Sequence, residues 1–197
     1  MNPIDVSLLR QAATAAAGGQ SFPAGALYVV ATPIGNLADL SLRAIHGLAL
    51  ADAIACEDTR HSAPLLRLLG IEGKPMLAVH EHNEREAAAG VIARLARGER
   101  VAFVSDAGTP AVSDPGAALV AAVSAAGYRC IPLPGASAAA AALSVAGDAH
   151  GQGFVFHAFL PAKGGERAQA LQRLAADPRT AILYEAPHRI ESLAREL

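Results

Sequence analysis

Short, mainly apolar runs alternate along the chain with segments whose apolar residues recur at helical spacing. The first run, Leu27–Ala31, is followed by a helical pattern through Leu42, Ile45 and Leu48. Four more apolar runs follow, at 53–56, 76–79, 101–105 and 128–133. A run without polar interruption is typical of a strand covered on both faces, and helical spacing is typical of a helix packed on one side. The pattern predicts an α/β domain over residues 25–147, with a mainly parallel sheet flanked by helices.

Residues that favour helix ends stand where these helices are expected to begin. Ser41, Asn83 and Asp114 are side chains preferred at the N-cap, and Pro115 is suited to a first helical position. Glycines at 70, 98 and 127 stand where helices are expected to end.

The two ends of the chain differ from this central domain. Residues 1–24 predict a short helix or a tail, and their Ala/Gly-rich composition favours the tail. The segment "GDAHGQG", 147–153, predicts a linker. Residues 148–197 contain two strand-like runs, each followed by a helical pattern, and predict a second, smaller α/β domain. Because two strands make a poor independent sheet, we expect this domain to be truncated here or completed by another copy.

Composition narrows the class of protein. Apolar residues make up 52% of the chain, yet no run reaches the ~18 residues of a membrane span, and no signal peptide is evident, which favours a cytoplasmic protein. Cys56 and Cys130 stand far apart, which fits a reducing compartment and argues against structural zinc. The net charge of −2 lacks the basic footprint of a nucleic-acid binder, so an RNA partner would need local patches.

Glycine, proline and polar residues gather where the predicted strands end. These corners are "TPIGN" (32–36, the first corner), "EDTRH" (57–61, the second), "DAGTPAVSDPG" (106–116, the fourth) and "LPGAS" (133–137, the fifth). In a parallel sheet all such corners meet at the carboxyl edge, where ligands bind. Ordinary turn chemistry explains any one corner equally well. Neither GxGxxG nor GxxxxGK[ST] is present, which argues against a dinucleotide or nucleoside triphosphate.

Six ordered blocks carry a resemblance to a known family: "VVATPIGNLADLSLRA", "ACEDTRHSAPLL", "FVSDAGTPAVSDPG", "PLPGASAAAAAL", "FLPAKGGER" and "YEAPHRI". Over residues 25–197 the chain resembles the tetrapyrrole methylase superfamily, in the branch that methylates ribosomal RNA. The first and fourth corners have the form of that branch, where the cobalamin and sirohaem enzymes carry "GPG" and "GDP". A small-molecule methyltransferase on the same fold and a cofactor-binding scaffold without activity remain the alternatives.

The resemblance implies a homodimeric enzyme that binds S-adenosylmethionine (SAM) between two domains and releases S-adenosylhomocysteine (SAH). It implies 2′-O-methylation of a cytidine ribose in the decoding region of 16S rRNA, within the small ribosomal subunit, without a metal. The cofactor-binding residues implied in the first domain are Pro33, Asp106, Ala107, Gly108, Thr109, Val112, Pro134, Gly135 and Ser137. Those implied in the second domain are Leu160, Tyr184, Glu185 and Ala186. For Asp106, bonding the amides of its own turn is an equal alternative.

The second corner holds the candidate catalytic residues Glu57, Asp58 and Arg60. Two acids beside an arginine can form a general base held by an ion pair. A local salt bridge that shapes the corner, with Asp58 as a helix cap, explains the same residues. His80 and His82 suggest a metal, but a turn would make their side chains diverge, so we expect a solvated corner.

Four residues of the second domain are candidates for RNA contact: Lys163, Arg167, His188 and Arg189. The glycines after Lys163 would form a mobile loop able to fold over a phosphate. A generic solvated loop is the alternative for the same residues.

Overall fold

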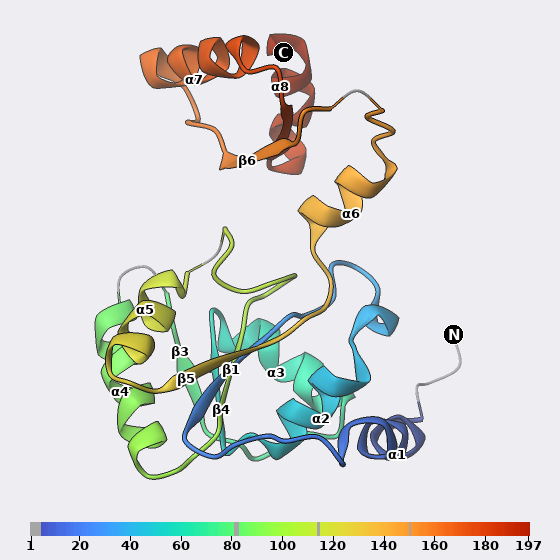
Figure 1. Ribbon diagram of the computed structural model, residues 1–197, viewed down its shortest axis with the longest axis vertical. Helices are drawn as coiled ribbons and strands as arrows, with labels where there is room; N and C mark the ends of the chain where they lie inside the picture. The colour runs from blue at the N-terminus through green and yellow to red at the C-terminus, as the bar shows by residue number, and fades with distance from the viewer. Residues whose placement is uncertain (1–4, 81–82, 114, 150) are drawn as a thin grey trace. The chain divides into compact units, whose positions relative to one another are not determined.

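The computed structural model describes residues 5–80, 83–113, 115–149 and 151–197, and the chain forms two compact units (Figure 1). The first unit ends at Ser137 and the second begins at Ala138. Each unit combines a parallel sheet with helices, so the predicted α/β class is confirmed.

The first unit is built on five parallel strands, in the order β3-β2-β4-β1-β5. Their bounds are β1 Ala26–Val30, β2 Ala53–Cys56, β3 Met76–Ala78, β4 Val101–Val104 and β5 Arg129–Leu133. Every residue of β2 and β4 is buried, which is why these strands read as continuous apolar runs.

Helices cover both faces of this sheet. Their bounds are α1 Val6–Ala17, α2 Leu42–Leu50, α3 Thr59–Leu68, α4 Glu84–Ala96 and α5 Ala117–Ala125, with a short 3₁₀ helix η1 at Leu37–Asp39. One core cluster packs Leu48 of α2 and Leu66 of α3 under one face. The other packs Val91 of α4 and Val123 of α5 under the opposite face (Figure 1). The small core side chains allow both helical layers to lie close to the sheet.

The N-terminal segment is a helix, whereas its composition favoured a tail. Asp5 caps α1, because its carboxylate accepts a hydrogen bond from the Leu8 N–H at 3.0 Å. Ala13 and Ala17 are buried in the same core cluster as α2 residues. Packing on α2 therefore orders a segment that sequence pattern alone leaves ambiguous.

The predicted cap is confirmed at Ser41, whereas the predicted side-chain cap at Asn83 is absent. Ser41 caps α2 as predicted, with Oγ accepting from the Ala44 N–H at 3.1 Å. Asn83 makes no such cap on α4; its amide instead accepts from His80 N–H and donates to the Ala78 carbonyl. Helix α5 begins at Ala117 with Gly116 as N-cap, and the predicted cap Asp114 lies outside the described residues.

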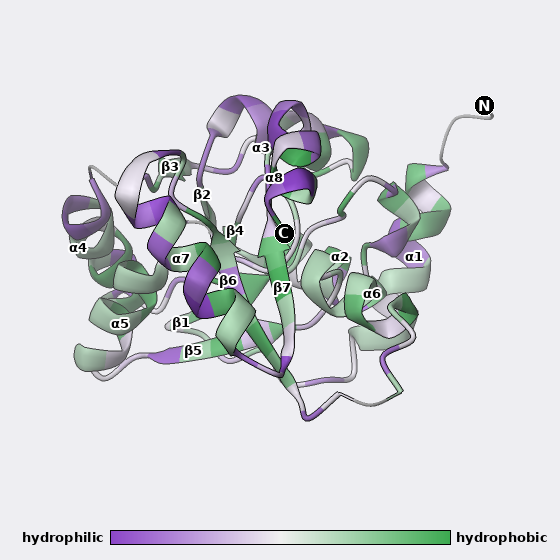
Figure 2. Cartoon of the chain, turned by 90° about the horizontal axis from the view of Figure 1, so that it is seen from above, coloured by the Kyte–Doolittle hydropathy of each residue, from purple (hydrophilic) through white to green (hydrophobic). Residues whose placement is uncertain are grey.

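The second unit contains a two-stranded parallel sheet and its helices. Its elements are α6 Ala138–Val145, β6 Phe154–Phe159, α7 Gly164–Ala176, β7 Thr180–Tyr184, the 3₁₀ helix η2 Pro187–Arg189 and α8 Ile190–Glu196. Leu160, Ala170, Leu174 and Leu193 form its buried core. Hydrophilic and hydrophobic stretches both occur along α7 (Figure 2). The predicted linker 147–153 lies between α6 and β6, and the domain boundary at residue 147 stays a prediction.

Of the helices that the structure describes, none has both the length and the apolar character needed to cross a bilayer.

Candidate ligand-binding edge

The carboxyl edge of the five-stranded sheet holds a pocket of about 200 Å³. Its walls come from three corners and from α3, and its residues are Pro33, Gly35, Asn36, Leu37, His61, Ser62, Leu65, Ser105 and Asp106. Strand β4 lies between β2 and β1. After β4 the chain continues into α5, which packs on one face of the sheet. After β1 and β2 it continues into α2 and α3, which pack on the opposite face. Such a divergence opens a crevice beyond the strand ends.

Hydrogen bonds join the first, fourth and fifth corners. Thr32 and Gly108 form an antiparallel bridge, with N···O distances of 2.8 and 3.1 Å. Thr109 Oγ1 donates to the Ala136 carbonyl at 3.1 Å, which joins the fourth corner to the fifth. The first bond joins residues that are 76 apart in the sequence, and the second joins residues that are 27 apart.

Two of the predicted glycines have a steric role at this edge. Gly108 has a φ of 82°, a left-handed conformation that glycine adopts without strain. A Cβ on Gly135 would lie 2.9 Å from the Ala31 Cβ, so only glycine lets the fifth corner pass this closely over the residue before the first corner. Of the other predicted cofactor residues in this unit, Pro33 and Ser137 are half-buried, and Ala107, Val112 and Pro134 are exposed.

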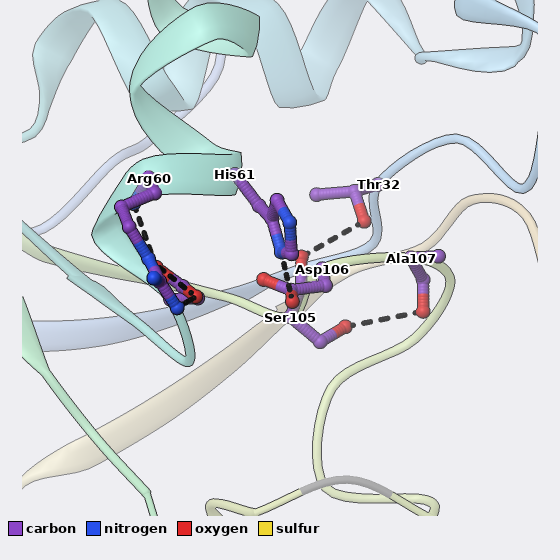
Figure 3. Close-up of polar contacts among 7 residues, drawn as sticks. Thr32, Arg60, His61, Ser105, Asp106 and Ala107 are labelled. Carbon is purple, nitrogen blue, oxygen red and sulfur yellow. Dashed lines mark hydrogen bonds and ion pairs between the residues drawn. The ribbon is translucent and has the colours of Figure 1, made fainter.

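A hydrogen bond connects the second and fourth corners at the pocket. His61 Nδ1 lies 2.7 Å from Asp106 Oδ2, and the two side chains point toward one another (Figure 3). The hydrogen bond and charge of Asp106 raise the pKa of His61, and the charge of Asp58 adds to this. Because the His61 side chain is 67% exposed, the pair remains accessible from solvent.

The predicted catalytic residues of the second corner serve the start of α3. Asp58 is its N-cap, accepting from the Arg60 N–H at 2.8 Å. The Arg60 guanidinium forms a bidentate pair with the same carboxylate and lowers the pKa of Asp58 to about 2. This geometry matches the alternative of a corner-shaping salt bridge. Glu57 is half-buried beside it.

In the second unit, the predicted cofactor residues surround the end of β7. Leu160 belongs to the core, and Tyr184 Oη accepts from the Ala139 N–H at 3.2 Å. Glu185 has a side chain only 1% exposed and pairs with Arg189 at 2.6 Å. The Ala186 N–H and Arg189 hold the pKa of Glu185 below its usual value.

The four predicted RNA contacts differ in accessibility. Lys163 and His188 are exposed, and the Arg189 side chain is partly exposed while it pairs with Glu185. Arg167 is different, because its side chain is 9% exposed and its Nε donates to Glu196 Oε2 at 2.6 Å. The same guanidinium donates to the Pro161 carbonyl at 2.9 Å. This geometry does not support the RNA contact predicted for Arg167 and assigns it an internal structural role.

Metal-binding geometry is not found among the residues that the structure describes: no group of three or more His, Cys, Asp or Glu side chains converges there. His80 is exposed after β3, and His82 lies outside the described residues.

A family model of tetrapyrrole (corrin/porphyrin) methylases matches residues 26–197. The chain belongs to this family. It is 54% identical over 172 residues to the ribosomal RNA small subunit methyltransferase I of Pseudomonas aeruginosa, covering 87% of this chain and 60% of that protein. It is 54% identical over 173 residues to the protein of the same name from Xylella fastidiosa, covering 88% and 63%. The chain therefore spans about 60% of the length of these relatives.

A solved structure extends the comparison to the fold of this tetrapyrrole methylase. The native form of uroporphyrin III C-methyl transferase from Thermus thermophilus superposes with a TM-score of 0.59 at 20% identity. The alignment covers 86% of this chain and 74% of that one. At this level of identity, the comparison shows a shared fold.

Sequence reasoning missed His61 as a site residue. The histidine is the last residue of the "EDTRH" corner, which drew attention for its acids and arginine. Its partner Asp106 is 45 residues away in the sequence. The adjacency of β2 and β4 brings the two together, and one sequence carries no signal for that pairing.

Proposed function

We propose that this tetrapyrrole methylase is a SAM-dependent methyltransferase that acts on the ribose 2′-hydroxyl of a cytidine in the decoding region of 16S rRNA. The observation that carries the proposal is the 54% identity to two proteins named ribosomal RNA small subunit methyltransferase I. The substrate in this proposal is the small ribosomal subunit, and the enzyme works as a cytoplasmic homodimer.

The pocket chemistry supports a cationic nucleoside ligand. Asp106 places a carboxylate at the pocket, and a carboxylate favours a nearby positive charge such as a sulfonium or an amino group. Gly35 has a φ of 126° and open space where a Cβ would stand, so the first corner leaves room beside Pro33. These features support SAM as the ligand. The proposal assigns its remaining contacts to the residues predicted in the fourth and fifth corners.

In the second unit, the proposal assigns adenosine contacts to Leu160 and to the strand end Tyr184–Ala186. Glu185 supports this assignment indirectly. Its buried pairing with Arg189 holds the end of β7 in one conformation, as a binding surface requires.

Bound SAM supplies a methyl group on a positively charged sulfur that leaves readily. The protein's own contribution is to hold the ribose hydroxyl in line with that methyl group and to exclude water. Orientation of this kind accounts for a large share of the rate in displacement reactions. The bridge between Thr32 and Gly108 supports such orientation, because it fixes two pocket walls relative to each other.

Methyl transfer from radiolabelled SAM tests the proposal directly. We expect label in 16S rRNA when the protein is incubated with small ribosomal subunits, and no label in an added tetrapyrrole. The phosphodiester bond that follows the labelled ribose should resist alkaline hydrolysis, because its 2′-hydroxyl is methylated. Calorimetry with SAH should show binding. Label in the tetrapyrrole alone would favour the small-molecule alternative, and SAH binding without transfer to either substrate would favour the scaffold.

A further inference from the structure

The pair formed by His61 and Asp106 is the one place at the pocket where two titratable side chains from separate corners meet at hydrogen-bond distance among the residues described. Nδ1 of His61 lies 2.7 Å from Oδ2 of Asp106, and both residues line the pocket. A histidine that engages a carboxylate through Nδ1 keeps its proton there when neutral. Its Nε2 then carries the lone pair that can accept a proton.

We propose that His61 is the proton acceptor for the attacking ribose hydroxyl and that Asp106 positions its ring. The inference rests on the proposed function. As the bond between the ribose oxygen and the methyl carbon forms, the carbon–sulfur bond breaks and its electron pair stays on sulfur. The hydroxyl proton passes to Nε2 of His61 and then to water, so a neutral imidazole becomes an imidazolium and the sulfonium becomes a neutral thioether.

His61 is better suited to this role than the carboxylates of the second corner. An effective general base has a pKa near the working pH, and imidazole lies there whereas free carboxylates lie near 4. Asp58 is further from that range, because Arg60 holds its pKa at about 2. Its carboxylate oxygens also already accept bonds from the backbone and guanidinium of Arg60. The second corner thus contributes a capped helix start that holds His61 in place.

The charges around His61 determine the sign of the pH dependence. Asp106 and Asp58 raise its pKa, whereas Arg60 lowers it more weakly. Only neutral imidazole accepts a proton, so the rate should rise with pH through the pKa of His61. Replacing Asp106 by Asn removes the dominant acidic partner and should move this rising limb to lower pH.

The first part of the experiment measures the protonation of His61 and does not require methyl transfer. Nitrogen-15 NMR of the imidazoles in the full chain should show His61 protonated on Nδ1 in its neutral form, with a pKa above the ordinary value of about 6.5. The pKa should fall in Asp106→Asn. A His61 pKa that is unchanged by this substitution would overturn the positioning role of Asp106.

The second part is single-turnover methyl transfer from SAM to small ribosomal subunits. His61→Gln should lower the rate by roughly 10²- to 10⁴-fold, the range of general base catalysis, and leave the Kd for SAH close to that of the parent protein. His80→Gln, the same change at an exposed position two residues after β3, is the matched control and should retain the parent rate. The proposal would be overturned if His61→Gln methylated at the rate of the parent protein. It would also be overturned if the affinity of this variant for SAH fell by the same factor as its rate. A parent protein that neither binds SAH nor methylates would instead refute the proposed function itself.

Discussion

Thr32 and Gly108 are 76 residues apart in sequence and are joined by reciprocal backbone hydrogen bonds. The Thr32 hydroxyl adds bonds to the carbonyls of Ser105 at 3.2 Å and Gly108 at 3.4 Å, and the residue is 1% exposed. The first and fourth corners are therefore one connected structure at the edge of the sheet. The geometry of the pocket depends on this connection, because Pro33 and Asp106 directly follow the bonded residues.

Thr32→Val should weaken this connection while it preserves the side-chain shape. The backbone bonds remain, and loss of the buried hydroxyl should cost about 1 kcal/mol in the free energy of unfolding. Affinity for SAH should fall as well, because the pocket walls lose a shared anchor. Urea unfolding and calorimetry measure the two effects.

The matched control is Thr14→Val, at an exposed position on α1. We expect its effect on stability to stay within about 0.5 kcal/mol, with SAH affinity unchanged. Equal effects of the two substitutions would show that the Thr32 hydroxyl does not support the corners.

Arg167→Ala should destabilise the second unit strongly. The substitution removes a guanidinium that is 9% exposed and leaves the Glu196 carboxylate and the Pro161 carbonyl without their partner. Because Glu196 is 35% exposed, the loss comes mainly from the buried side of the contact, and we expect about 1 to 3 kcal/mol in the free energy of unfolding. Hydrogen exchange of the amides in α7 and α8 should report the loss.

Arg195→Ala provides the comparison, because the Arg195–Glu191 pair has side chains that are 78% and 84% exposed. A surface pair of this kind contributes about 0.5 kcal/mol or less. If both variants showed the same protection from exchange, Arg167 would not have the internal role that its contacts indicate.

Lys163→Ala should weaken binding to the small ribosomal subunit without lowering stability. Lys163 is exposed at the N-terminus of α7, and its ammonium group is free to reach a phosphate in the proposed complex. Loss of one phosphate contact should reduce the slope of log K against log salt concentration by about 0.7 to 0.9. Filter binding across a salt titration measures that slope.

The control for this variant is Arg67→Ala, which removes an exposed positive charge from α3. Its salt dependence should match that of the parent protein. An unchanged slope in Lys163→Ala would remove this residue from the RNA contacts.

The pattern of apolar runs predicted the strands of the first unit. Strand β2 occupies the predicted residues, and the observed ends of β1, β3, β4 and β5 lie within one residue of the predicted ends. Strands buried on both faces have continuous apolar runs, and this signal is local. The cap of α2 was also predictable, because Ser41 acts on residues three positions away. Asn83 stands at the N-cap position of α4 but makes no side-chain cap bond, because its amide bonds to His80 and Ala78, which precede the helix, instead.

The candidate site shows the same division. Sequence by itself determined the α/β class, the presence of tight corners at one edge and the family to which those corners belong. Tertiary structure alone decided that the Arg167 side chain is buried beside Glu196 and that His61 meets Asp106. The physical reason is range: propensity and periodicity act over a few residues, whereas strand order and side-chain burial determine which distant charges meet.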